Sequence, residues 1–131
     1  PGWYLVIVTT SVVNREIHYD VQFNKPTIWL IGPAAGSDDF AEESEGWSFT
    51  VPTTKDGEFV SPAFVGSVPA GTDKGVRMYV KIPGHDWWHS EFVVLDGKIK
   101  YRATGGDQDR ATGSVGQQVH LNIAEGTGEI K

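Results

Sequence analysis

The chain contains no cysteine among its 131 residues, which excludes disulfide bridges and thiolate chemistry but does not identify the compartment. No apolar run approaches 18 residues, so no segment is predicted to span a membrane as a helix. The chain does not open on a basic and then apolar segment, so we expect any export signal or lipid anchor to lie outside it. A membrane is therefore expected as a partner only through such an anchor.

Basic residues are also scarce, with 11 Lys and Arg against 17 Asp and Glu and a formal charge of −6. Because nucleic-acid binders need clustered Lys and Arg, nucleic acid is not expected as a partner. No amphipathic segment of helical length is visible. What the chain does have is 16 Gly, 7 Pro, 15 aromatic residues and many β-branched residues, a composition typical of short strands with frequent turns.

Period-two alternation predicts an all-β fold. The stretch 16–23 alternates polar and apolar residues without error, and Asn14-Arg15 and Asp96-Gly97 are hairpin turn signals. Further strands are expected over 3–8, 27–31, 47–51, 58–65, 76–82, 91–95, 98–102 and 118–123, followed by a Gly-rich tail. Eight or nine short strands in this spacing predict one antiparallel β-sandwich, Ig-like or starch-binding-module-like, over residues 1–131. The alternation predicts inward-facing side chains at Ile17, Tyr19, Val21, Phe23, Ile99 and Tyr101.

Two adjacent tryptophans carry the main functional signal, in the run Gly84-His85-Asp86-Trp87-Trp88-His89. On an extended segment neighbouring side chains point to opposite faces, so we expect one ring in the core and the other exposed. An exposed indole beside polar side chains is suited to stacking on a sugar ring. Asp86, His89 and Lys81 lie close to the tryptophan pair in sequence, so they are candidates to bind the hydroxyl groups of the sugar. This pattern predicts glycan binding, with no cofactor.

Other candidate residues have structural alternatives. Trp47 is expected in the core more readily than at a ligand. Arg102, Asp107, Gln108 and Arg110 form either hydroxyl-binding contacts or a local ion-pair network that fixes their loop. His85 and His89 have metal-pair spacing, but in an extended chain they would lie about 13 Å apart, so no metal is predicted. The acidic loop 37–46 is interpreted as solvated, with calcium binding as the alternative.

The order of motifs resembles a known family. Residues 28–36 form a strand that ends in Gly and small residues, a loop then reaches Gly46-Trp47, and Asp56-Gly57-Glu58-Phe59 follows. From Ile28 to the C-terminus this order resembles the starch-binding modules of SusE and SusF, outer-membrane lipoproteins of Bacteroidota polysaccharide-utilisation systems. The resemblance implies surface exposure at the outer membrane, a polysaccharide or oligosaccharide ligand, and other glycan-uptake proteins as partners. It also implies that residues 1–23 either begin this module or close a preceding one.

Two other classes of function remain as alternatives. A small glycoside-active enzyme needs two carboxylates about 5 to 9 Å apart across a cleft, for which Asp86, Asp107 and Asp109 are candidates. A spacer module without ligand needs the tryptophan pair only for packing. The preferred reading is a non-catalytic glycan-binding module, in which the tryptophan pair is exposed and polar groups converge on it.

Overall fold

The computed structural model describes residues 2–37, 40, 47–71, 73–103 and 105–131. Nine strands form within these residues, in two sheets that are both antiparallel. A two-stranded sheet pairs β1 with β2, and a seven-stranded sheet has the order β3-β5-β6-β7-β9-β8-β4. The strands are β1 (Leu5–Val13), β2 (Glu16–Asn24), β3 (Ile28–Ile31), β4 (Phe59–Val60), β5 (Arg77–Val80), β6 (Glu91–Leu95), β7 (Lys98–Tyr101), β8 (Val119–Asn122) and β9 (Thr127–Ile130).

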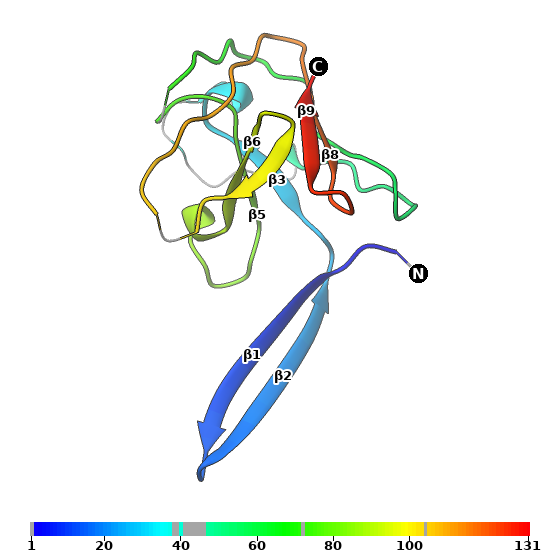
Figure 1. Ribbon diagram of the computed structural model, residues 1–131, viewed down its shortest axis with the longest axis vertical. Helices are drawn as coiled ribbons and strands as arrows, with labels where there is room; N and C mark the ends of the chain where they lie inside the picture. Colours follow the sequence, from blue (N-terminus) through cyan, green and yellow to red (C-terminus); the bar gives the residue numbers. More distant parts are fainter. Residues whose placement is uncertain (1, 38–39, 41–46, 72, 104) are drawn as a thin grey trace.

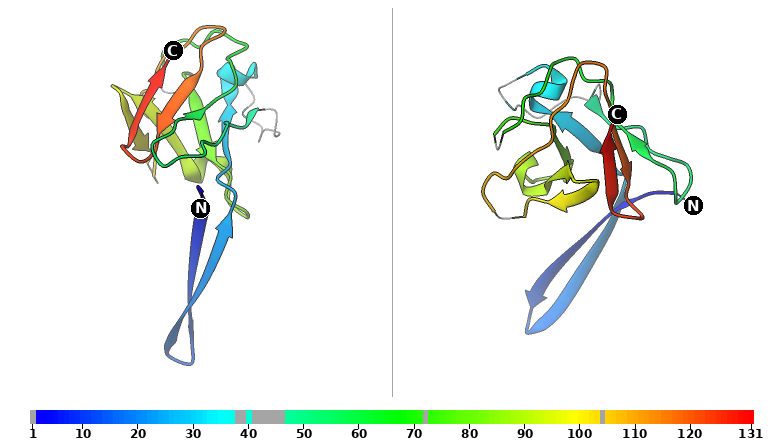
Figure 2. Two further views of the ribbon diagram at one scale, coloured as in Figure 1. Left: turned by 90° about the vertical axis from the view of Figure 1, so that its right-hand side faces the viewer. Right: turned by 45° about the horizontal axis from the view of Figure 1, so that its top comes forward.

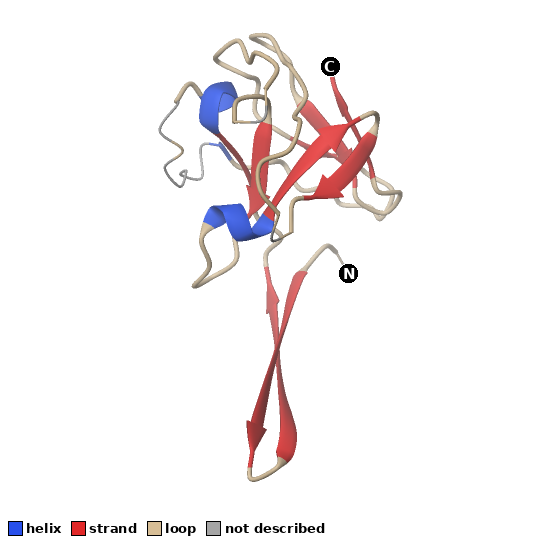
Figure 3. Ribbon diagram, turned by 60° about the vertical axis from the view of Figure 1, so that its left-hand side comes forward, coloured by secondary structure: helices blue, strands red, loops and turns tan. Residues whose placement is uncertain are grey.

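The predicted all-β, antiparallel fold is confirmed, and the seven-stranded sheet curls around one core (Figures 1 and 2). Two short 3-10 turns, η1 (Gly32–Ala35) and η3 (Trp87–Ser90), lie beside the strands (Figure 3). Both hairpin turns lie at their predicted places, with positive φ at Asn14, Arg15, Asp96 and Gly97. Positive φ at both central residues gives the turn the twist of the strands that it joins.

The core lies inside the curled sheet and is made of aliphatic and aromatic side chains from most of its strands. Leu30, Met78, Val119 and Leu121 are fully buried, and Phe59 and Phe64 are nearly so. Trp47 packs against this core while remaining partly exposed, as expected for a residue with a mainly structural role. Trp3 also packs here, since its ring meets Phe59 edge-on at 5.3 Å between centroids.

The prediction of inward-facing side chains was wrong for five of six residues. Ile99 is partly buried and packs against the core, as predicted. Ile17, Tyr19, Val21, Phe23 and Tyr101 are instead exposed, by 50% to 68%. Four of them lie on β2, and within the described residues the β1–β2 hairpin pairs with no strand of the larger sheet, so no second layer covers it. Tyr101 lies at the rim of an open groove, where its hydroxyl donates to the backbone oxygen of His89.

The boundaries of several strands also differ from the prediction. The segment 47–51 makes only isolated bridges, from Ser48 to Trp29 and from Thr50 to Val60. The Gly-rich tail contains β9, which pairs with both β7 and β8. Gly128 of β9 lies so close to the core that a Cβ atom there would be 2.7 Å from Val94. This glycine therefore reflects close packing, not an irregular tail.

Candidate functional site

The tryptophan pair lies on the 3-10 turn η3, between β5 and β6. Gly84 has φ +77, a conformation that favours glycine, and it begins the reversal of the chain. The amide of His89 then donates to the backbone oxygen of Asp86 at 3.1 Å, which closes the turn. Buried Ser90 fixes the turn to the sheet, because its hydroxyl donates to the backbone oxygen of Val80.

Trp87 is the packed member of the pair. Its ring stacks on Phe40 with 6.0 Å between centroids and an interplanar angle of 15°, and it meets Tyr79 edge-on at 6.1 Å. The guanidinium carbon of Arg77 lies 5.1 Å from the centroid of Trp87 and 4.6 Å from that of Phe40. Both distances are within the range of cation–π attraction. Trp87 is therefore held by two aromatic rings and one cation.

Trp88 is the exposed member, with 39% of its surface accessible. The two rings differ in exposure as predicted, but Trp87 is only partly buried and lies outside the main hydrophobic core. A 3-10 turn, not an extended strand, separates the two rings. The imidazole of His89 lies against Trp88, with 3.7 Å between ring centroids. Tyr101, 63% exposed on the neighbouring strand β7, is joined to the turn by its hydrogen bond of 2.6 Å to the backbone oxygen of His89.

The two histidines are closer than an extended chain would place them. The turn brings the ring centroids of His85 and His89 to 6.3 Å, so the expected separation of about 13 Å was wrong. Both side chains are exposed. Within the residues that the structure describes, no group of three or more potential ligands is arranged to hold a metal ion. The predicted acidic loop, 37–46, lies outside the described residues except for Ser37 and Phe40.

Beneath the turn lies a buried ion cluster centred on Glu91, the first residue of β6, whose side chain is fully buried. Oε1 accepts hydrogen bonds from Nε of Arg77 at 2.8 Å and Nε of Arg110 at 3.0 Å. Oε2 accepts from Nη1 of Arg102 at 2.6 Å and Nη2 of Arg77 at 3.2 Å. Every lone-pair direction of a carboxylate has a charged donor in this arrangement.

Asp107 closes the cluster from the solvent side. Its Oδ1 lies 3.0 Å from Nη2 of Arg110, 3.3 Å from Nη2 of Arg77 and 3.5 Å from Nη2 of Arg102. Desolvation by burial raises the pKa of Asp107, but the hydrogen bond from Arg110 and the three guanidinium charges outweigh it. The net result is a pKa below the ordinary value of an aspartate.

The ten candidate residues therefore fall into three groups. Asp86, Trp88 and His89 are exposed together on the η3 turn. Trp87, Trp47 and Lys81 are partly buried, and the Lys81 ammonium lies 5.8 Å from the Trp29 ring centroid. Arg102, Asp107, Gln108 and Arg110 belong to the ion cluster and its loop, where the Gln108 backbone oxygen accepts from Arg110 at 3.0 Å. The contacts of this third group are those of a local ion-pair network.

Sequence reasoning missed Glu91, Arg77, Phe40 and Tyr101. Arg77 lies between Val76 and Met78, and Glu91 begins a strand that continues with the apolar run 92–95. An unpaired charge in such a strand is costly, so a partner for each could have been expected. Nothing in the sequence identifies which residue that partner is.

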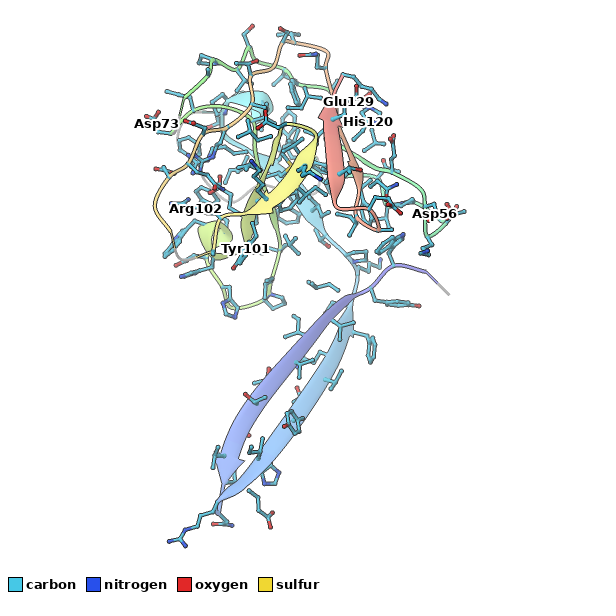
Figure 4. The ribbon with its side chains drawn as sticks, in the orientation of Figure 1. Asp56, Asp73, Tyr101, Arg102, His120 and Glu129 are labelled. Atoms are coloured by element: carbon cyan, nitrogen blue, oxygen red, sulfur yellow. The ribbon has the colours of Figure 1, made fainter. Side chains whose placement is uncertain are left out.

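A separate polar depression of about 400 Å³ is lined by Glu58, His120, Asn122 and Glu129, among other residues. It lies on the opposite side of the body from Tyr101 in Figure 4. Glu58 is paired with Nδ1 of His120 at 2.8 Å, and Glu129 lies 3.5 Å from the ammonium of Lys131. Within the described residues, no helix has the length and apolar character needed to cross a membrane.

Comparison with known proteins identifies the family. The model of SusF/SusE starch-specific carbohydrate-binding modules matches residues 27–129. The chain belongs to this family. The resemblance inferred from Ile28 onward is thereby confirmed, with nearly the same boundaries.

One curated relative is the outer membrane protein SusF of Bacteroides thetaiotaomicron, which is 42% identical to this chain over 133 residues. That alignment covers 99% of this chain and 25% of SusF. The crystal structure of SusF from Bacteroides thetaiotaomicron matches with a TM-score of 0.81 at 42% identity, covering 99% of this chain and 28% of that one. The chain thus spans about a quarter of the length of this relative.

Proposed function

We propose that this module binds starch-type glucan without cleaving it, at the η3 turn, with Trp88 as the stacking platform. The observation that carries the proposal is the division of the tryptophan pair. Trp87 is anchored by Phe40 and Tyr79, whereas Trp88 is exposed on the same short turn. An anchored turn holds the exposed ring in place before the ligand arrives, which lowers the entropic cost of binding.

The polar groups around Trp88 suit a sugar. His89 lies against the Trp88 ring, so the proposed sugar stacks on the remaining indole surface. Asp86 and His85 are exposed on the same loop, and they supply acceptors and donors for hydroxyl groups. Tyr101 adds a second exposed ring, which is fixed to the turn through the backbone oxygen of His89. A curved glucan chain would then contact Trp88 and Tyr101 with successive sugar rings.

The absence of catalysis is part of the proposal and rests on where the carboxylates lie. Glu91 is buried and bonded to three arginines, and Asp107 faces the same three. Glu58 and Glu129 share a depression, but Glu58 contacts the His120 ring and Glu129 lies 3.5 Å from the Lys131 ammonium. Among the described residues that line this depression there is no Trp, Tyr or Phe. A glycosidase needs one carboxyl group that stays protonated as an acid and a second one that is free to act as base or nucleophile.

We further propose that the module acts at the outer membrane surface, as its relative SusF is named an outer membrane protein. One stacking site is worth about 1 to 3 kcal/mol, by analogy with base stacking on aromatic side chains. Such a site alone binds weakly, so useful capture would require several modules on one polypeptide or in one uptake complex.

The test compares Trp88→Ala with Trp87→Ala, using isothermal titration with maltoheptaose and retention in amylopectin gels. Trp88→Ala should abolish measurable binding and change the free energy of unfolding by less than about 1 kcal/mol. Trp87→Ala should lower the free energy of unfolding by on the order of 3 kcal/mol, because it removes a packed aromatic side chain. Tyr19→Ala is the matched control, since Tyr19 is an exposed aromatic residue on the distant hairpin.

Three results would contradict the proposal. The first is unchanged glucan binding in Trp88→Ala. The second is a folded wild-type module that binds no glucan, which would favour a spacer. The third is release of reducing sugar from maltoheptaose that disappears in Glu58→Gln, which would favour an enzyme.

A further inference from the structure

The two faces of the β1–β2 hairpin differ in polarity. Its register places Val6 opposite Phe23, Val8 opposite Val21, Thr10 opposite Tyr19 and Val12 opposite Ile17. Directly opposed residues in an antiparallel pair share a face, so these eight side chains form one surface, here called the apolar face. The other face, here called the polar face, carries Glu16, His18, Asp20 and Gln22 of β2. Opposite them on β1 lie Val13, Ser11, Thr9 and Ile7, so this face is mixed but the more polar of the two.

The apolar face is open. Val12 is 72% exposed, Tyr19 and Phe23 are each 68% exposed, and Ile17 is 63% exposed. The hairpin extends away from the seven-stranded body in every view of Figures 1 and 2. An exposed apolar patch of this kind normally marks an interaction surface.

The size of the face is sufficient for a protein interface. A buried Tyr or Phe covers about 150 to 250 Å², so Tyr19 and Phe23 alone leave roughly 200 to 340 Å² to be covered. With the five aliphatic side chains, the face approaches the roughly 800 Å² per partner of a standard interface. An isolated two-stranded hairpin is also marginally stable in water. Both points indicate that the hairpin needs a partner.

The family comparison indicates which partner. The family model matches residues 27–129, so the hairpin lies outside the matched region. The alignment with SusF nevertheless covers 99% of this chain, hairpin included, and only 25% of SusF. The hairpin is thus retained in a relative that has about four times as much polypeptide.

We propose that the β1–β2 hairpin completes a neighbouring β-module of the same longer polypeptide, with its apolar face forming part of that module's core. The strict alternation of β2 fits a sheet with one face buried and one in water, which leaves Glu16, His18, Asp20 and Gln22 solvated. The outer edges of the hairpin also agree with this proposal. Among the described strands β1 and β2 pair only with each other, so the outer edge of each can pair with a strand of the neighbouring module. The short segment between Asn24 and Ile28 would then connect the two modules.

The experiment compares hydrogen exchange in the 131-residue chain with that in the natural gene product containing it. In the 131-residue chain, the hairpin amides should exchange at least 100-fold faster than those of β5 and β6. In the longer polypeptide they should become as protected as the strands of the seven-stranded sheet. Val21→Ser should lower the melting temperature of the longer polypeptide and leave that of the 131-residue chain unchanged. His18→Ser, on the polar face, is the matched control and should change neither.

Three outcomes would overturn the proposal. One is a gene product that ends at these 131 residues. Another is equal exchange of the hairpin amides in both proteins. The third is a concentration-dependent dimer of the 131-residue chain in sedimentation, with its hairpin amides protected, because a second copy would then be the occupant of the apolar face.

Discussion

Replacing buried Glu91 by glutamine tests whether the ion cluster holds the fold together around the site. The cluster contains three arginines and two carboxylates, so it carries a net single positive charge. Glu91→Gln keeps the shape of the side chain but doubles that net charge in a place with little water. It also turns one acceptor oxygen into an NH2 group that faces a guanidinium group.

The expected loss follows from the contacts. Four charged donor groups bond to Glu91 at 2.6 to 3.2 Å, and each such bond contributes about 1.5 to 3 kcal/mol when measured singly. The contributions are not additive, and removing one partner of a buried pair typically costs about 3 to 5 kcal/mol. We expect Glu91→Gln to lie in that range, a large share of the about 5 to 15 kcal/mol that stabilises a domain of this kind.

Urea unfolding monitored by tryptophan fluorescence measures this loss. Glu58→Gln is the matched control, because Glu58 also contacts a nitrogen-bearing side chain, the His120 ring, but is 46% exposed. Its effect should stay below about 1 kcal/mol, as for most surface ion pairs. A Glu91→Gln variant within 1 kcal/mol of wild type, with an unchanged urea dependence, would refute the idea that the cluster stabilises the domain.

Two further predictions concern the same region. Because the pKa of Asp107 is lowered in the fold, its contribution to stability is complete above the ordinary pKa of about 3.9 and is lost as the pH falls through the lower, folded value. The stability difference between wild type and Asp107→Asn should therefore shrink in melting curves taken at progressively more acid pH, and a difference that is constant with pH would contradict this. Gly75→Ala should cost about 2 to 5 kcal/mol, since Gly75 has φ +70 and a Cβ there would collide with the Cβ of buried Arg110. Gly97→Ala, at φ +72 with open space around it, should cost only about 1 to 2 kcal/mol, and equal losses in urea unfolding would show that backbone conformation alone decides the outcome.

Local patterns predicted the elements that depend on local physics. The Asp96-Gly97 turn and strand β6 were found where expected, because turn residues and apolar runs act over a few positions. Strand β9 was missed because Gly128 is usually read as a chain breaker. Only the packing of Gly128 against Val94, far away in the sequence, shows why a side chain is excluded there.

Alternation predicted strand β2 correctly but not what covers it. A two-residue period predicts that one face of the strand is buried. It does not indicate which part of the protein, or which partner, covers that face. For Ile17 to Phe23 the nearby sheet does not cover that face, and the side chains remain exposed. The same limit applies to Glu91, since its partners Arg77 and Arg110 lie 14 and 19 residues away.

The ion cluster also limits how a sugar can be recognised at the proposed site. Arg102 and Arg110 have the planar donors that suit hydroxyl groups, but these donors point to Glu91 and Asp107. Recruiting them for a ligand would leave a buried carboxylate short of partners, which costs more than a surface hydrogen bond returns. Recognition at Trp88 must then rely on stacking and on exposed groups such as Asp86 and Tyr101. Few directional contacts and one platform give weak and tolerant binding, which suits a glucan that offers many identical rings to several modules.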